Sequence, residues 1–208
     1  CRALSSSGTD TYSAIAGAVG SLKGPLHGGA NAKVMQMFRD VKAHVNAQDD
    51  GSIRDYLVKI LSREAGDRSG KIYGLGHAVY TLSDPRAVLL KKYAGHLAEI
   101  KGFADDFALL EKVETIGASL LQEKRRSDDP ICANVDMYSG LVYHMLGIPQ
   151  EVFTPLFATA RIAGWCANRM EEVLTGNRIM RPAYRAGTIR NHYLPMDERE
   201  AHMELPEA

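Results

Sequence analysis

Cysteine is scarce in this sequence, and no apolar run is long. The only cysteines are Cys1, Cys132 and Cys166, which are far apart and form no C-x-x-C pair. This pattern argues against a disulfide framework or a zinc cage, and it favours a reducing, cytoplasmic setting. Because no apolar run reaches the roughly 18 residues of a transmembrane helix, we do not expect a membrane span.

An excess of charge of one sign is also missing. Lysine plus arginine and aspartate plus glutamate each number 25, so no net field would recruit nucleic acid or an anionic membrane. The composition, 45% hydrophobic and 24% charged, is that of a globular domain able to bury a core. The chain begins with Cys1 rather than with methionine, and no signal-type segment precedes it, so we expect a fragment.

Apolar residues recur with the spacing of helices. Val34, Met37, Phe38 and Val41 follow the i, i+3, i+4, i+7 pattern of one buried helix face. Period-2 alternation is absent, so the sequence predicts an all-α, multi-helical protein. The further helices that we expect lie at about 11–22, 53–61, 87–100, 109–120, 135–146 and 152–174. The tail after residue 182 is expected to be extended, gripping a partner subunit, or else disordered.

Some helix ends can be predicted from single residues. Ser52 is a candidate N-cap for the helix at 53–61, and Gly176 is a candidate stop for the last helix. Pro155 either opens that last helix after a Thr154 cap, or bends a helix that starts nearer Gln150.

Three polar clusters stand at expected joints between helices. They read G-P-L-H-G-G-A-N around His27, G-L-G-H-A-V-Y-x-x-S-D-P-R around His77, and N-V-D around Asp136. Glycines beside each histidine allow a ligand close to the backbone, and loops held by rigid elements often carry function. Viewed singly, each cluster also fits an incidental turn or, for Asp136, a helix N-cap.

Together and in this order, the clusters resemble the citrate synthase family. The similarity continues through Leu146-Gly147-Ile148-Pro149, through the segment that holds Arg161, and through Arg178-Ile179-Met180-Arg181-Pro182. The resemblance implies the citrate-synthase-like small domain at 29–147. It also implies large-domain helices at 1–28, and large-domain helices with a tail at 148–208. About as much chain again, which the family carries upstream, is missing here.

The resemblance also implies roles for the three clusters. Asp136 would take a proton from the methyl group of acetyl-CoA, His27 would hydrogen-bond the thioester oxygen, and His77 would polarise the ketone of oxaloacetate. The expected reaction is therefore the condensation of acetyl-CoA with oxaloacetate to citrate and free CoA. Acetyl-CoA is a substrate here, and no cofactor is expected. Propionyl-CoA, as in 2-methylcitrate synthase, is an open alternative because one methylene changes binding by only about 1–3 kcal/mol.

Binding residues follow from the same resemblance. Arg86, Arg161 and Arg181 fall at carboxylate-binding positions, and guanidinium binds a carboxylate through two parallel hydrogen bonds. For each arginine the alternative is a surface ion pair. Four further residues would line the CoA side: Gly74, Leu75, Gly76 and Asn134.

The remaining histidines and the assembly complete the expectations. Surface or packing roles are expected for His44, His96, His144, His192 and His202. No metal site is expected, because neither His27 nor His77 has a companion ligand at i+3 or i+4. The resemblance implies a homodimer for the full-length protein. For the fragment alone, a non-catalytic helical domain that binds CoA or a partner is the competing hypothesis.

Overall fold

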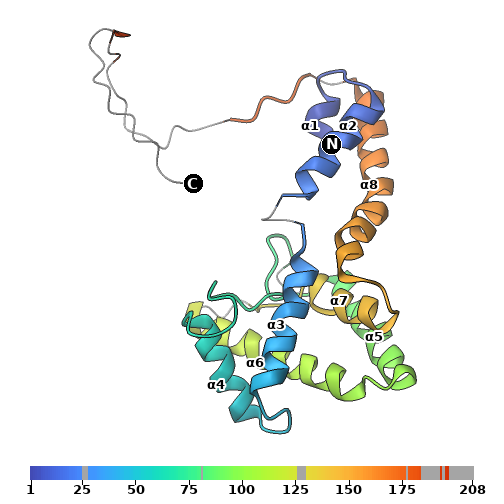
Figure 1. Ribbon diagram of the computed structural model, residues 1–208. Helices are drawn as coiled ribbons and strands as arrows, with labels where there is room; N and C mark the ends of the chain where they lie inside the picture. The colour runs from blue at the N-terminus through green and yellow to red at the C-terminus, as the bar shows by residue number, and fades with distance from the viewer. Residues whose placement is uncertain are drawn as a thin grey trace.

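The computed structural model is built from helices (Figure 1). It describes residues 1–24, 28–80, 82–125, 130–176, 178–183, 193, 195 and 196. The helices are α1 (Arg2–Ser5), α2 (Thr11–Leu22), α3 (Ala30–His44), α4 (Asp50–Leu61), α5 (Pro85–Lys101), α6 (Ala104–Arg125), α7 (Asp136–Met145), the 3₁₀ turn η1 (Gln150–Val152) and α8 (Phe153–Thr175). Within these residues the only β-type pairing is an isolated bridge between Leu75 and Ala133. The prediction of an all-α protein is confirmed.

Some helix ends agree with the sequence-based expectations and others do not. Residues 11–22 form α2 as predicted, and Gly176 ends α8 in the left-handed conformation at φ 60°. The Ser52 cap is wrong, because Asp49 caps α4 by accepting a hydrogen bond from the Gly51 N–H at 2.9 Å. The Ser52 hydroxyl instead accepts a hydrogen bond from the backbone N–H of Asn46, in the turn before α4.

The start of α8 and the first helix also differ from expectation. The Thr154 cap is wrong, because Val152 occupies the cap position after η1. Pro155 lies in the first turn, where backbone N–H groups have no helical partner and a proline costs little. The four-residue helix α1 was not predicted, since a segment this short has no periodicity to detect.

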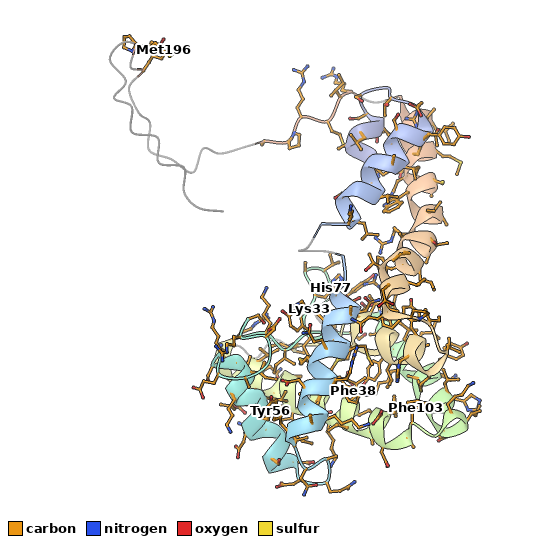
Figure 2. All side chains as sticks on the ribbon, in the orientation of Figure 1. Lys33, Phe38, Tyr56, His77, Phe103 and Met196 are labelled. Carbon is orange, nitrogen blue, oxygen red and sulfur yellow. The ribbon has the colours of Figure 1, made fainter. Side chains whose placement is uncertain are left out.

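Helices α3 to α7 enclose the main core (Figure 1). The closest packing is between α5 and α7, α3 and α7, and α4 and α6. Phe38, labelled in Figure 2, is 2% exposed at the centre of α3. Tyr138 is fully buried on α7, where its hydroxyl donates to Glu114, which also pairs with Lys91. Burial raises the pKa of Tyr138, and the Glu114 charge adds to this effect.

Helices α1 and α2 pack against α8 away from that core (Figure 1). Over its 23 residues α8 buries only Phe153 and Glu172. Large apolar side chains in this part are therefore open, including Tyr12 at 88% and Leu174 at 84% exposure. The domain boundaries after residues 28 and 147 stay a prediction. No helix in the described part of the chain is long and apolar enough to cross a bilayer.

Candidate active site

The His77 loop is fixed to the segment before α7. The Gly76 N–H donates to the Cys132 carbonyl at 2.8 Å, and the Asn134 N–H donates to the Gly74 carbonyl at 2.8 Å. These bonds flank the Leu75–Ala133 bridge. Two segments almost 60 residues apart thus form one rigid platform, and it contains all four residues expected on the CoA side.

Asn134 and Gly74 give this platform its shape. The Asn134 side chain donates to the Gly76 carbonyl at 3.0 Å and accepts from the Asp136 N–H at 3.0 Å. It therefore links the loop of His77 to the first turn of α7. Gly74 has φ +89°, and a Cβ atom there would lie 2.6 Å from the Met137 sulfur. Only glycine combines that backbone conformation with so close an approach.

His77 is held in one tautomer by its own loop. Its Nδ1 accepts hydrogen bonds from the backbone N–H groups of Val79 at 3.0 Å and Tyr80 at 3.1 Å. An Nδ1 that accepts carries no hydrogen, so the neutral ring carries its hydrogen on Nε2. The Tyr80 ring packs on the imidazole at a centroid distance of 4.8 Å. His77 is therefore a positioned donor through Nε2.

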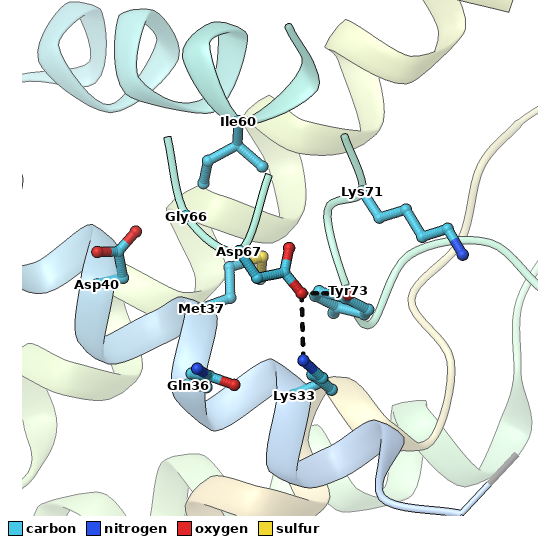
Figure 3. A pocket seen from close by; sticks show the side chains of 9 residues that line it. All are labelled: Lys33, Gln36, Met37, Asp40, Ile60, Gly66, Asp67, Lys71 and Tyr73. Atoms are coloured by element: carbon cyan, nitrogen blue, oxygen red, sulfur yellow. Dashed lines mark hydrogen bonds and ion pairs between the residues drawn. The ribbon is translucent and has the colours of Figure 1, made fainter. Parts of the chain in front are cut away.

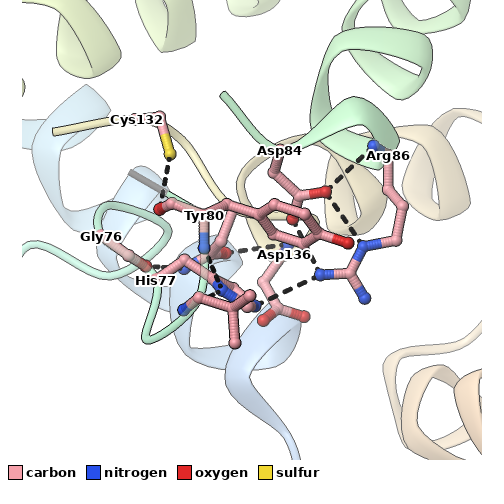
Figure 4. A network of polar contacts seen from close by, with 9 residues as sticks. Gly76, His77, Tyr80, Asp84, Arg86, Cys132 and Asp136 are labelled. Atoms are coloured by element: carbon pink, nitrogen blue, oxygen red, sulfur yellow. Dashed lines mark hydrogen bonds and ion pairs between the residues drawn. The ribbon is translucent and has the colours of Figure 1, made fainter. Parts of the chain in front are cut away.

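Arg86 lies beside that donor because Asp84 holds it there (Figure 4). The Asp84 carboxylate accepts from the Arg86 Nε at 3.0 Å, from its Nη2 at 2.8 Å and from its backbone N–H at 3.0 Å. Asp84 is only 1% exposed. Its burial opposes the charged form, but the hydrogen bonds from Arg86 outweigh it and set the pKa of Asp84 below its ordinary value. The same contact raises the pKa of Arg86.

The Arg86 Nη2 reaches within 3.4 Å of His77 Nε2. Both atoms carry hydrogens in the tautomer described above, so neither can accept from the other. Two donors that converge without sharing an acceptor define a place for an oxygen atom of a ligand. Asp136 lies beside them in Figure 4, and its charge is close enough to favour the cationic form of Arg86.

Asp136 begins α7 without capping it. The cap position is Val135, so the expectation of an ordinary Asp136 cap is wrong. Asp136 instead lines a small cavity of about 30 Å³ together with Asn31, Thr154 and Phe157. The first turn of α3 forms one wall of this cavity, through Gly29 and Ala30. His27, two residues upstream of that wall, lies outside the described residues.

The other two arginines lie differently. Arg161 is half-buried on α8 with its guanidinium 5.0 Å above the ring of Phe157, which lines the Asp136 cavity. No carboxylate in the described ranges lies within 4.0 Å of Arg161. Arg181 is exposed in the segment that follows α8, where the Met180 N–H donates to the Ser6 hydroxyl on the α1 side. The structure does not bring Arg181 to His77, and its role stays a prediction.

The stretch before the His77 loop is anchored to α3 (Figure 3). The Asp67 carboxylate accepts from the Tyr73 hydroxyl at 2.6 Å and from the Lys33 ammonium at 3.3 Å. Burial disfavours the charged carboxylate, yet the hydrogen bonds from Ser69 and Tyr73 lower the pKa of Asp67 overall. Tyr73 immediately precedes Gly74, so this contact positions the platform of the Leu75–Ala133 bridge relative to α3.

Comparison with known proteins decides the family. Residues 1–183 match the family described as citrate synthase, C-terminal domain. The chain belongs to the citrate synthase family. It is 41% identical to the citrate synthase of Deinococcus radiodurans over 95% of this chain and 48% of the relative. It is 37% identical to the 2-methylcitrate synthase of Shewanella oneidensis over 88% of this chain and 43% of that relative.

Solved structures agree with this membership. The citrate synthase of Thermoplasma acidophilum, solved as a ternary complex with carboxymethyl coenzyme A and oxaloacetate, superposes with a TM-score of 0.72 at 30% identity. The superposition covers 95% of this chain and 49% of that one. The chain thus spans about half the length of the relatives it matches.

Sequence reasoning missed two contributors to the site. Asp84 belongs to the S-D-P-R motif, but the motif does not reveal that Asp84 is buried or that it accepts three hydrogen bonds from Arg86. Both features arise from the tertiary fold. Tyr80 supplies a ring to both His77 and Arg86, whose guanidinium lies 5.6 Å from its centroid. An available signal was the proline at 85, which marks Asp84 as a helix cap. Among the described residues, no three His, Cys, Asp or Glu side chains are grouped as for a metal.

Proposed function

We propose that the protein containing this chain condenses acetyl-CoA with oxaloacetate and hydrolyses the product to citrate and free CoA. Asp136 removes a proton from the acetyl methyl group. The resulting carbon nucleophile attacks the ketone carbon of oxaloacetate while His77 donates a proton to the ketone oxygen. Water then cleaves the thioester and releases the thiol of CoA. Acetyl-CoA is a substrate in this scheme, and the scheme needs no cofactor or metal.

The chemistry requires this set of groups. The methyl hydrogens of a thioester are very weakly acidic, so a carboxylate can remove one only if the charge on the thioester oxygen is stabilised as it develops. We assign that stabilisation to His27, which precedes Gly29 of the cavity wall by two residues in the sequence. Positioned acid–base groups contribute about 10²–10⁴-fold each to the rate.

The observation that carries the proposal is the fixed tautomer of His77. Two backbone N–H groups occupy Nδ1, so Nε2–H must be the donor, and it converges with the Arg86 guanidinium. A 2-oxo acid offers one acceptor to each of them, with its ketone oxygen on His77 and its carboxylate on Arg86. Asp84 prevents Arg86 from rotating away. Arg161 is a suitable partner for the second carboxylate of oxaloacetate. We assign Arg181, which does not lie at His77 in this chain, to the corresponding site of a neighbouring subunit.

Propionyl-CoA is the second candidate acyl donor, because a 2-methylcitrate synthase is among the relatives. The citrate synthase of Deinococcus radiodurans is the more similar of the two relatives, at 41% against 37% identity. Acetyl-CoA is therefore our first choice.

The assembly and location that we propose are a homodimer in the cytoplasm, without nucleic-acid or membrane partners. Apolar side chains of α2 and α8, such as Tyr12 and Leu174, are exposed in this chain. Their exposure supports the proposal that another protein surface covers them in the full-length dimer. Light scattering on the full-length protein tests the dimer, because a monomer at micromolar concentration would contradict it. For the 208-residue chain alone we expect no turnover, since half of the family's length is absent.

Release of free thiol from acetyl-CoA and from propionyl-CoA, each with oxaloacetate, tests the function. The full-length protein should release thiol with a higher kcat/KM for acetyl-CoA. Preference for propionyl-CoA would select the alternative, and the absence of release with both would overturn the enzyme proposal. In that case, CoA binding by the isolated chain would favour the hypothesis of a non-catalytic, CoA-binding domain.

A further inference from the structure

A second cavity lies further along α3, toward the C-terminal end of that helix. It has a volume of about 350 Å³ and is bounded by α3, α7, the start of α6 and the segment from Ile148 to Phe153. Small-molecule sites are typically clefts of about 300–1,000 Å³. None of its lining residues belongs to the candidate active site.

The floor of this cavity is apolar and firmly packed. Met35 and Phe38 of α3, Leu141 of α7 and Phe153 of α8 line it, and each is at most 4% exposed. The Phe153 ring also packs edge-on against Tyr143 at 5.1 Å. Because these side chains belong to the core, the floor is already formed before any ligand arrives.

The rim carries a cation without an anionic partner. The Arg39 guanidinium donates to the Met35 carbonyl at 3.2 Å and to the amide oxygen of Gln150, both of which are neutral acceptors. In the described portion of the chain, no carboxylate lies within 4.0 Å of Arg39. Lys42, the neighbouring cation, is already paired with Asp106. The rim therefore has one unbalanced positive charge above an apolar floor.

We propose that this cavity binds a small monocarboxylate with an apolar tail. The carboxylate replaces the Gln150 amide at Arg39, because a charged acceptor makes the stronger hydrogen bond with guanidinium. The tail lies on Phe38, Leu141 and Phe153. A cationic ligand would be repelled by Arg39, and a neutral one would gain nothing over the Gln150 amide that it displaces.

The position of Gln150 gives binding a structural consequence. Gln150 opens η1, which leads directly into α8, whereas Arg39 belongs to α3. Their contact joins residues 111 positions apart in the chain. A carboxylate on Arg39 releases this contact, so binding changes the environment of η1 as well as that of the cavity floor.

Hexanoate titrated into the 208-residue chain carrying ¹³C-methyl methionine tests the proposal by NMR. The Met35 methyl signal should shift saturably, while Met180, exposed after α8, should not move. Hexanoate should bind at least about tenfold more tightly than hexanamide, the expected effect of a charge-assisted hydrogen bond. Hexylamine, matched in length, should bind no better than hexanamide.

Variants separate the rim charge from general effects. Arg39→Gln should weaken hexanoate binding at least about tenfold. Arg54→Gln is the matched control, because Arg54 is also a helical arginine with a partly exposed side chain but pairs with Glu123 on α6. Gln150→Ala removes the competing amide and should leave hexanoate binding equal or tighter, which tests the site even if Arg39→Gln fails to fold.

Several results would overturn the proposal. They are an unshifted or unsaturated Met35 signal, equal binding of hexanoate and hexylamine, or wild-type binding by a folded Arg39→Gln variant. Weaker hexanoate binding by Gln150→Ala would also contradict it, because the amide would then be a ligand contact rather than a competitor.

Discussion

Replacing Asp84 by asparagine tests the contact that positions Arg86. Asparagine has the same shape and retains an oxygen for the Arg86 Nε and backbone N–H. It also remains a good N-cap for α5, which Asp84 begins. The substitution therefore removes the negative charge and the contact with Nη2 but keeps the helix cap.

The expected loss of stability is about 2 kcal/mol. Hydrogen bonds to charged groups contribute roughly 1.5–3 kcal/mol, and removing one partner of a fully buried ion pair costs about 3–5 kcal/mol. The Arg86 side chain is 37% exposed, so water compensates part of its unpaired charge and the lower range applies. Asp84→Ala should lose about 1 kcal/mol more, because it also removes the cap.

The pH dependence follows from the direction of the pKa shift. The pKa of Asp84 is lower in the folded protein than its ordinary value of about 3.9. Its charge therefore stabilises the folded state fully above about pH 5. That contribution is lost as the pH falls from this range through the folded-state pKa. The difference between wild type and Asp84→Asn should thus shrink in acid.

Urea unfolding followed by far-UV circular dichroism measures these differences at pH 7 and pH 3. In the full-length protein, Asp84→Asn should also raise the KM for oxaloacetate more than it lowers kcat. A variant as stable as wild type at pH 7, or a stability gap that is the same at pH 3, would refute the account. An unchanged KM would mean that Arg86 needs no positioning by this carboxylate.

Three other substitutions test the site from different directions. Asp136→Asn should lower kcat for thiol release by about 10²–10⁴-fold while the melting temperature stays near that of wild type; unchanged turnover would remove Asp136 as the base. Gly74→Ala should destabilise the chain by about 1–3 kcal/mol in urea unfolding, whereas Gly20→Ala, in open space on α2, should be neutral or stabilising by up to about 1 kcal/mol. Arg161→Leu should raise the KM for oxaloacetate, and Arg54→Leu should not; equal KM values for both would exclude a carboxylate role for Arg161.

Helix positions could be predicted where local signals act alone. Both ends of the helix at residues 11–22 were predicted correctly, and Gly176 was predicted to end α8. These helix ends could be predicted because they depend on residues that are close in the sequence. The start of α4 could not be placed in this way. The D-D-G-S run around Ser52 contains several residues able to cap a helix, and the choice depends on a contact from Asn46 in the preceding turn.

The packing of α8 shows a different limit. The segment is rich in apolar residues, yet only Phe153 and Glu172 are buried along it. A hydrophobic pattern reports which face can be covered, but it does not say by which element. The same pattern on α3 was a reliable guide because α7 packs closely against that helix in this chain.

The proposed catalytic residues could be predicted only through the resemblance. His77 and Asp136 are 59 residues apart, and no periodicity indicates that Asn134 joins their segments through Gly76. The donor state of His77 depends on two backbone N–H groups that a sequence cannot place. The resemblance therefore proposes which residues react, whereas the hydrogen bonds of the loop set the tautomer in which His77 would do so. That division predicts that Val79→Pro, which removes one of the two N–H donors to Nδ1, lowers kcat for thiol release by the full-length protein.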